Sequence, residues 1–263
     1  MKPDEPYKEE AITSADMTAS TQALPPRLDD GTSLFLDLDG TLLELIDKPD
    51  EVRADTRLRA TLLDVHARLE GRLAIVSGRS IAQMEVILGA DTTEQLVLSG
   101  SHGSEYRWSG QSHSPERPVA LDAATEEMHR FAQAHDDVLL EEKSFGVALH
   151  YRLMPSIEPE ARALAQRLSG ELGLFLQEGK MMVELRPGGH DKGVAIRHLM
   201  EHSGLSAARP VFAGDDITDE SGFEAVAQLG GYGILVGATR PSAAHYHLPH
   251  PQAVRNWLKE LLI

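Results

Sequence analysis

The sequence contains no cysteine among its 263 residues. This absence excludes disulfide bonds, thiolate metal sites and cysteine nucleophiles. The sequence also lacks an apolar run long enough to span a bilayer, and its N-terminal residues show no basic start followed by an apolar stretch. We therefore expect a cytoplasmic protein without a membrane-spanning segment.

Basic residues are scarce, because 25 Lys and Arg stand against 41 Asp and Glu and give a formal net charge of -16. A surface with this charge repels nucleic acid and anionic membranes, so we expect neither as a partner. An anionic substrate would need a metal ion and a few placed bases to offset the charge. We expect a small-molecule substrate and a monomeric protein.

The chain is long enough for one core and a smaller second unit. Residues 1–30 are rich in Glu, Asp, Ser, Thr, Ala and Pro without sustained periodicity, which predicts a mobile tail. After the tail, short apolar segments such as Leu73–Val76 and Pro210–Ala213 alternate with segments whose apolar residues recur at helical spacing. Alternating strands and helices predict a doubly wound, Rossmann-like parallel α/β sheet.

This alternation is interrupted in the middle of the chain. A Gly- and Ser-rich stretch, Ser99–Gly110, is followed by a pattern of two helices and four strands. The pattern is typical of an inserted α+β unit. We therefore expect a core domain formed by residues 31–108 and 186–263, with an inserted cap domain at residues 109–185.

Two aspartates follow the first expected strand directly. The apolar run Leu34–Leu36 ends in Asp37 and Asp39, and Gly40 follows. Alternation places both carboxylates on one side of the strand's carboxyl end, where open α/β sheets bind ligands. Since unpaired carboxylates would repel each other, we expect a hard cation between them, with Asp37 as nucleophile and Asp39 as proton carrier. The alternative is an acidic strand end that only caps the next element.

Two further residues suit phosphate chemistry. Ser77 ends the second strand, so its hydroxyl and the following backbone N–H groups can hold phosphate oxygens. Lys192 begins an expected helix, where the macrodipole disfavours a cation unless an anion such as phosphate or Asp37 lies opposite. A simple helix cap and an exposed lysine are the respective alternatives.

The turn G-D-D-I-T-D-E provides Asp215, Asp216 and Asp219 at the same sheet edge as Asp37. A helix cap accounts for one of these carboxylates but not for the cluster, which favours a divalent metal. We assign Asp215 as the direct ligand, and Asp216 and Asp219 as residues that act through waters or orient the ligands. Oxygen ligands alone indicate Mg²⁺, held by Asp37, Asp215 and the backbone carbonyl of Asp39.

These segments occur in the order of the haloacid dehalogenase superfamily of aspartate-nucleophile phosphatases, which the chain resembles beyond its tail. Further segments are similar to the trehalose-6-phosphate phosphatase family: G-S-H-G-S-E-Y-R at 100–107, L-E-E-K at 140–143, L-H-Y-R at 149–152 and V-E-L-R-P at 183–187. The resemblance implies that the insertion is a lid and that trehalose-6-phosphate is the substrate, hydrolysed through an aspartyl-phosphate in trehalose biosynthesis.

The resemblance also implies the residues that recognise the substrate. The sugar-binding positions of the family correspond to Glu141, Lys143 and Glu184. Arg79, His102 and Gly103 join them as substrate-binding candidates. The alternatives are a phosphatase of sucrose phosphate or mannosyl-phosphoglycerate, a phosphomutase, and a sugar-phosphate sensor without catalysis, which would not need the nucleophile.

Overall fold

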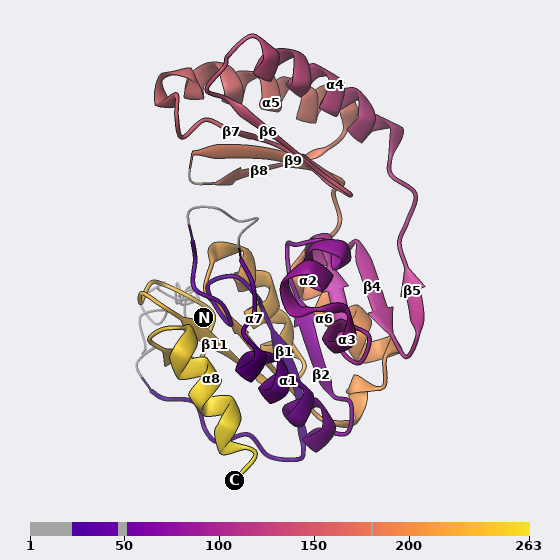
Figure 1. Cartoon of the computed structure of the whole chain (residues 1–263), viewed down its shortest axis with the longest axis vertical. Helices are drawn as coiled ribbons and strands as arrows, with labels where there is room; N and C mark the ends of the chain where they lie inside the picture. Colours follow the sequence, from indigo (N-terminus) through magenta and orange to yellow (C-terminus); the bar gives the residue numbers. More distant parts are fainter. Residues whose placement is uncertain (1–22, 47–51, 180) are drawn as a thin grey trace, which may run out of the picture.

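The computed structural model describes residues 23–46, 52–179 and 181–263, which form a larger α/β core and a smaller unit lying over one end of it (Figure 1). Residues 1–22, most of the expected tail, lie outside the described residues. Residues 23–30 pack on the core, because Leu28 is buried and Trp257 donates a hydrogen bond to the Pro26 carbonyl at 2.8 Å. None of the helices within the described ranges is long and apolar enough to cross a membrane.

The core contains an eight-stranded sheet in the order β12-β11-β10-β1-β2-β3-β4-β5. Its parallel strands are β1 (Thr32–Leu36), β2 (Leu73–Val76), β3 (Val97–Gly100), β10 (Arg209–Gly214), β11 (Tyr232–Val236) and β12 (Tyr246–Leu248). The antiparallel strands β4 (Glu105–Trp108) and β5 (Gln111–His113) extend one edge. All residues of β1 are buried, as the apolar run predicts for a central strand covered on both faces.

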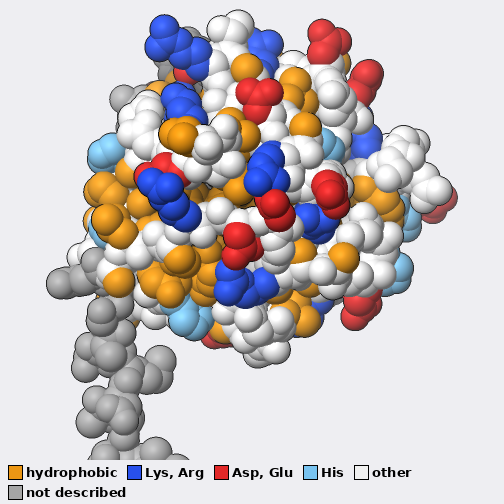
Figure 2. Space-filling model, turned by 90° about the horizontal axis from the view of Figure 1, so that it is seen from below, with side chains coloured by type: hydrophobic (Ala, Val, Ile, Leu, Met, Phe, Trp, Pro, Cys, Tyr) orange, Lys and Arg blue, Asp and Glu red, His pale blue; other side chains and the backbone are white. Residues whose placement is uncertain are grey.

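Helices cover both faces of this sheet, which confirms the predicted doubly wound fold. The helices α1 (Thr56–Arg68), α2 (Ile81–Leu88) and α8 (Pro251–Glu260) pack into one core cluster, while α6 (Lys192–His202) and α7 (Glu220–Gln228) pack into another. The short α3 (Ala90–Thr93) follows α2. Figure 2 views the molecule from below: acidic and basic side chains are interspersed there, with hydrophobic side chains between them.

The second unit is a four-stranded antiparallel sheet in the order β6-β7-β9-β8, covered on one face by two helices (Figure 1). The strands are β6 (Leu139–Lys143), β7 (Gly146–His150), β8 (Phe175–Gly179) and β9 (Met182–Arg186), and the helices are α4 (Val119–Gln133) and α5 (Glu158–Leu172). Val147, Leu149, Val183 and Leu185 pack against these helices. Because side chains alternate along a strand, residues such as Ala148 and Glu184 lie on the opposite face, which is turned toward the core.

The structure differs from the sequence-based expectation at the edge of the core. The stretch Ser99–Gly110, expected to break the sheet pattern, contains β4 and a 3₁₀ turn at Ser101–Gly103. β5 follows and still pairs with β4 in the core sheet, although its residues fall within the range expected for the cap. We therefore propose that the first crossing into the cap lies between His113 and Val119, while the return crossing spans residues 187–191 and leads directly to Lys192.

The Pro- and His-rich link before the last helix is ordered. Its sequence has no clear strand pattern, but Tyr246–Leu248 forms β12 beside β11. The ring of His247 contacts the Gly237 carbonyl at 2.6 Å, and the His250 ring accepts a hydrogen bond from the Ala253 N–H at the start of α8. These two histidines therefore hold the local backbone.

Candidate active site

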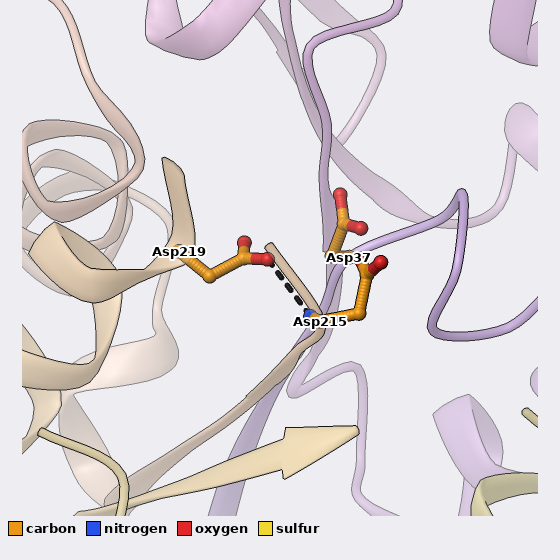
Figure 3. A group of neighbouring side chains, drawn as sticks. All are labelled: Asp37, Asp215 and Asp219. Carbon is orange, nitrogen blue, oxygen red and sulfur yellow. Dashed lines mark hydrogen bonds between the residues drawn. The ribbon is translucent and has the colours of Figure 1, made fainter. Parts of the chain in front are cut away.

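The two central strands bring the aspartates together. β1 and β10 run side by side, with Leu36 opposite Ala213, and the Asp37 N–H donates to the Ala213 carbonyl at 2.9 Å. Asp37, Asp215 and Asp219 therefore meet at one sheet edge, and each offers a carboxylate oxygen within 4.8 Å of the others. In Figure 3 the Asp37 and Asp215 side chains lie next to each other, and Asp219 faces them from the following turn.

Gly40 makes this approach possible. Its φ of 77° lies in the left-handed region that favours glycine, and a Cβ atom there would collide with the Asp215 carboxylate. The turn after β1 is closed by a hydrogen bond of 2.7 Å from the Gly40 N–H to the Leu43 carbonyl. Gly40 thus serves both the turn and the contact between two distant segments.

Asp219 organises the turn after β10. Its Oδ2 accepts hydrogen bonds from the N–H groups of Asp215 and Asp216, both at 2.9 Å, and its side chain is fully buried. Asp216 is exposed, and its Oδ1 accepts from the Ile217 N–H at 2.6 Å, which caps the 3₁₀ turn Ile217–Asp219. Asp219 therefore fixes the backbone that carries Asp215, whereas the Asp216 side chain is held on the surface of the turn.

Lys192 reaches the same point from the first residue of α6. Its Nζ donates to Asp37 Oδ1 at 2.7 Å and to Asp219 Oδ1 at 2.5 Å, and the residue is only 3% exposed. Burial alone would lower the pKa of Lys192, but the carboxylates of Asp219 and Asp37 outweigh it and raise that pKa. The ammonium is therefore charged and bridges two of the three aspartates.

The carboxylates carry more negative charge than Lys192 offsets. Burial raises the pKa of Asp37 well above its ordinary value, Asp219 and Asp215 add to the effect, and Lys192 opposes it. Burial, followed by the charge of Asp219, raises the pKa of Asp215 to about 7. Buried carboxylates that resist ionisation are ones that a cation would stabilise, and an all-oxygen set suits a hard divalent cation. The residues present therefore fit a metal ion.

A loop after β2 borders the aspartates. Ser77 is buried and its Oγ accepts a hydrogen bond from the Arg79 N–H at 3.1 Å, while Ser80 caps α2 in a reciprocal capping box with Gln83. A Cβ atom on Gly78 would lie only 2.6 Å from Nε2 of His102, so the imidazole packs directly on this loop.

The turn that carries His102 is strained. Ser101, His102 and Gly103 all have positive φ, at 48°, 55° and 95°. Burial lowers the pKa of His102 well below its usual value, and the positive charges of Arg186, Lys192 and Lys143 lower it further. The imidazole is therefore neutral. Non-glycine residues held at positive φ cluster at functional sites, as this pair does beside the Ser77 loop.

Arg79 contacts Asp39, the second of the two aspartates that follow β1. Its Nε lies 2.7 Å from Asp39 Oδ2 and its Nη2 lies 3.0 Å from Asp39 Oδ1, which is the two-pronged geometry that suits guanidinium and carboxylate. The sequence predicted Arg79 only as a substrate-binding residue. The ion pair joins residues 40 positions apart, and no local pattern marks it.

The three predicted sugar-binding residues come together on the face of the cap sheet that is turned toward the core. Lys143 Nζ lies 2.7 Å from Glu184 Oε2 and 3.9 Å from Glu141 Oε2. β7 separates their strands, and its residue between Glu141 and Glu184 is Ala148. A Cβ atom on Gly146 would lie 2.6 Å from Glu184 Oε1. Small residues on β7 therefore leave room for the lysine to reach across.

Other side chains on this face were not singled out from the sequence. His150 Nε2 lies 2.9 Å from Glu141 Oε2. The Arg186 guanidinium stacks over the Phe175 ring, donates to Gln177 Oε1 at 3.1 Å, and donates to the His190 carbonyl at 2.6 Å. Strand alternation applied to β7, β8 and β9 would have placed all of them beside the predicted residues.

A doubly wound sheet with aspartates after its central strands, a buried lysine between two of them and an inserted α+β cap defines a structural class, the haloacid dehalogenase-like fold. The fold matches a structure described as a haloacid dehalogenase-like hydrolase from Bacteroides thetaiotaomicron, with a TM-score of 0.64 at 17% identity over 87% of this chain and 98% of that one.

The comparisons also identify the family within this class. The model of the trehalose-phosphatase family matches residues 35–252. The chain is 35% identical over 238 residues to the trehalose-6-phosphate phosphatase of Escherichia coli (strain K12), which covers 89% of this chain and 88% of that protein. A crystal structure of a trehalose-6-phosphate phosphatase related protein matches with a TM-score of 0.73 at 28% identity, over 87% of this chain and 96% of that one. The chain belongs to the trehalose-phosphatase family.

Proposed function

We propose that the chain is a Mg²⁺-dependent phosphomonoester hydrolase that converts trehalose-6-phosphate to trehalose and phosphate, and so acts in trehalose synthesis. The observation that carries the proposal is the juxtaposition of two polar constellations. Asp37, Lys192 and Asp215 converge at the sheet edge, and Glu141 and Lys143 lie on the cap face turned toward it. One set suits phosphoryl transfer, and the other suits a sugar with many hydroxyl groups.

The first step uses Asp37 as the nucleophile. Lys192 holds Oδ1, which leaves Oδ2 to attack phosphorus. As the new bond between Oδ2 and phosphorus forms, the bond from phosphorus to the sugar oxygen breaks, and Asp39 donates a proton to that oxygen. The Ser77 hydroxyl and the Gly78 N–H hold the phosphoryl oxygens, because the next two N–H groups already donate within the loop, that of Arg79 to Ser77 Oγ and that of Ser80 to Gln83 Oε1. Trehalose leaves as a neutral alcohol.

The second step regenerates the enzyme. Asp39, now ionised, takes a proton from a water molecule that attacks phosphorus. The bond between phosphorus and Asp37 Oδ2 breaks, which restores the Asp37 carboxylate and releases phosphate. In the structure Arg79 donates to both carboxylate oxygens of Asp39, as it would to an ionised carboxylate, so this ion pair must open for Asp39 to carry the proton. Asp219 keeps Lys192 and the turn after β10 in place throughout.

Asp37, Asp215 and the backbone carbonyl of Asp39 would hold the Mg²⁺ ion. When bound, the ion supplies positive charge that offsets the repulsion between the carboxylates and the phosphate. Asp219 is less suited to direct ligation, because two N–H groups and Lys192 already occupy its oxygens.

The test is phosphate release from a panel of substrates, measured with Mg²⁺ and with excess chelator. The panel contains trehalose-6-phosphate, sucrose-6-phosphate, glucose-6-phosphate and p-nitrophenyl phosphate. A closed polar site rejects analogues that lack needed hydroxyls by roughly 10⁴, so we expect the disaccharide phosphate to exceed glucose-6-phosphate by several orders of magnitude in kcat/KM. Comparable efficiency on sucrose-6-phosphate or glucose-6-phosphate, or full activity in chelator, would contradict the proposal.

A further inference from the structure

The cap face carries a connected row of polar side chains from three strands. His150 of β7 contacts Glu141 of β6 at 2.9 Å, Glu141 lies 3.9 Å from Lys143, and Lys143 contacts Glu184 of β9 at 2.7 Å. Glu184 is almost fully buried, whereas Glu141 and His150 are each about one third exposed. His150 therefore lies at the end of the row beside Glu141, which is the more exposed of its two carboxylates.

The register explains why His150 and not its neighbour makes this contact. Glu141 pairs directly with Ala148, and His150 pairs with Leu139, so His150 and Glu141 are diagonal neighbours on one face. Ala148 is too short to hold a carboxylate, whereas a histidine ring spans the diagonal. The position of His150 is fixed by the next residue, because Tyr151 is fully buried and its N–H donates to the Met181 carbonyl at 3.0 Å.

The contact also determines how Glu141 presents its charge. An ionised carboxylate only accepts hydrogen bonds, so His150 Nε2 must carry the hydrogen. The hydrogen bond from His150 is the largest of the effects that lower the pKa of Glu141, followed by burial, which acts in the opposite sense, and by the charge of Lys143. Oε2 is therefore bonded to His150 and lies 3.9 Å from the Lys143 ammonium, so Oε1 is the oxygen that can accept from a ligand hydroxyl.

We propose that His150 is a positioning residue that fixes the Glu141 carboxylate for recognition of the sugar part of the substrate. The proposal rests on the proposed function, because it assumes that Glu141 contacts the sugar. His150 takes no part in phosphoryl transfer, which depends on groups of the core. Its loss should weaken the use of a disaccharide phosphate and leave the hydrolysis of a small aryl phosphate unchanged.

The experiment compares three substitutions at one position. His150→Ala removes the donor, His150→Phe keeps a ring without the donor, and His150→Gln restores an N–H donor on a flexible chain. The matched control is His129→Ala, because His129 is a histidine of the same domain on the exposed side of α4, where its ring contacts Gln133. Thermal unfolding of each variant reports whether the fold is retained.

We expect His150→Ala and His150→Phe to raise KM for trehalose-6-phosphate by about tenfold with little change in kcat, as is common when a hydrogen bond to a charged group is lost. We expect both variants to hydrolyse p-nitrophenyl phosphate like the wild type, His150→Gln to recover most of the loss, and His129→Ala to have no effect. In the Glu141→Ala background, His150→Ala should add no further loss, because the two residues act as one unit.

Equal losses on both substrates, no recovery in His150→Gln, or additive losses in the double variant would each overturn the positioning role. Failure of the proposed function is separate, because it appears in the wild type as a preference for another sugar phosphate. In that case His150→Ala, Glu141→Ala and the double variant are compared on the preferred substrate, and additive losses in the double variant still contradict the role of His150.

Discussion

Replacing Asp215 by Asn is expected to stabilise the metal-free protein although it removes activity. Burial and the charge of Asp219 raise the pKa of Asp215 from 3.8 to about 7 in the folded protein. A carboxyl group with a raised folded pKa binds its proton more tightly when folded than when unfolded. The stability associated with the protonated form is therefore lost as the pH rises from about 4 through about 7, and Asn avoids this loss.

The size of the effect follows from the shift. A rise from 3.8 to about 7 is about three pKa units, and each unit corresponds to about 1.36 kcal/mol. Ionisation of Asp215 therefore lowers the free energy of unfolding by at most about 4 kcal/mol at about pH 8. The shift already includes the attraction of the carboxylate to the Lys192 charge. Since burying the Asn amide without a fixed hydrogen-bond partner costs about 1 to 3 kcal/mol, we expect a net gain of roughly 1 to 3 kcal/mol. For a protein of this size, 1 kcal/mol shifts Tm by about 2 to 4 °C.

The assay is thermal unfolding of the wild type and of Asp215→Asn at about pH 8 and about pH 5, in excess chelator and in Mg²⁺. In chelator the variant should have the higher Tm at the alkaline pH. At the acidic pH the difference in Tm between the variant and the wild type should be less than about half of its alkaline value. Mg²⁺ should raise the Tm of the wild type and barely change that of the variant. A lower Tm for the variant in chelator at alkaline pH, or a difference independent of pH, would refute the reasoning.

Three further predictions concern activity. Asp37→Asn should abolish phosphate release from trehalose-6-phosphate while its circular dichroism matches the wild type; substantial turnover in a pure preparation would exclude Asp37 as the nucleophile. Lys192→Ala should lower kcat by about 10²- to 10³-fold and raise KM much less, because the ammonium acts where charge develops; an effect on KM alone would assign the lysine to substrate binding. Lys143→Ala should lower kcat/KM for trehalose-6-phosphate and leave p-nitrophenyl phosphate hydrolysis unchanged, whereas Lys259→Ala, at an exposed site on α8, should change neither.

Much of the fold could be predicted, because its strongest signals are local. The run Leu34–Leu36 is continuously apolar, and the turn residues that follow it fix the end of β1. The fold class and the phosphatase assignment are confirmed by the comparisons. β5 could not be predicted, because Gln111–His113 are all exposed, show no apolar alternation and pair only with β4.

Contacts within the site were predictable only where sheet geometry determines them. Parallel strands end at the same edge, so Asp37 and Asp215 were expected to meet. The ion pair of Arg79 with Asp39 depends on the rotamer of a long side chain across a loop, and no spacing encodes that. The contact of His150 with Glu141 required the register of β6 and β7, which the sequence leaves open. The individual roles of these residues stay predictions.

The return crossing from the cap acts as a short tether. Only residues 187–191 separate Arg186, at the end of β9, from Lys192, so the six Cα–Cα steps between those residues span at most about 20 Å. Gly188 and Gly189 give this tether rotational freedom, while the bond from Arg186 to the His190 carbonyl keeps it folded back. This short link limits how far the cap can move from the core on this side. Because the link ends at Lys192, we expect a movement of the cap to act directly on the segment that holds this lysine beside Asp37.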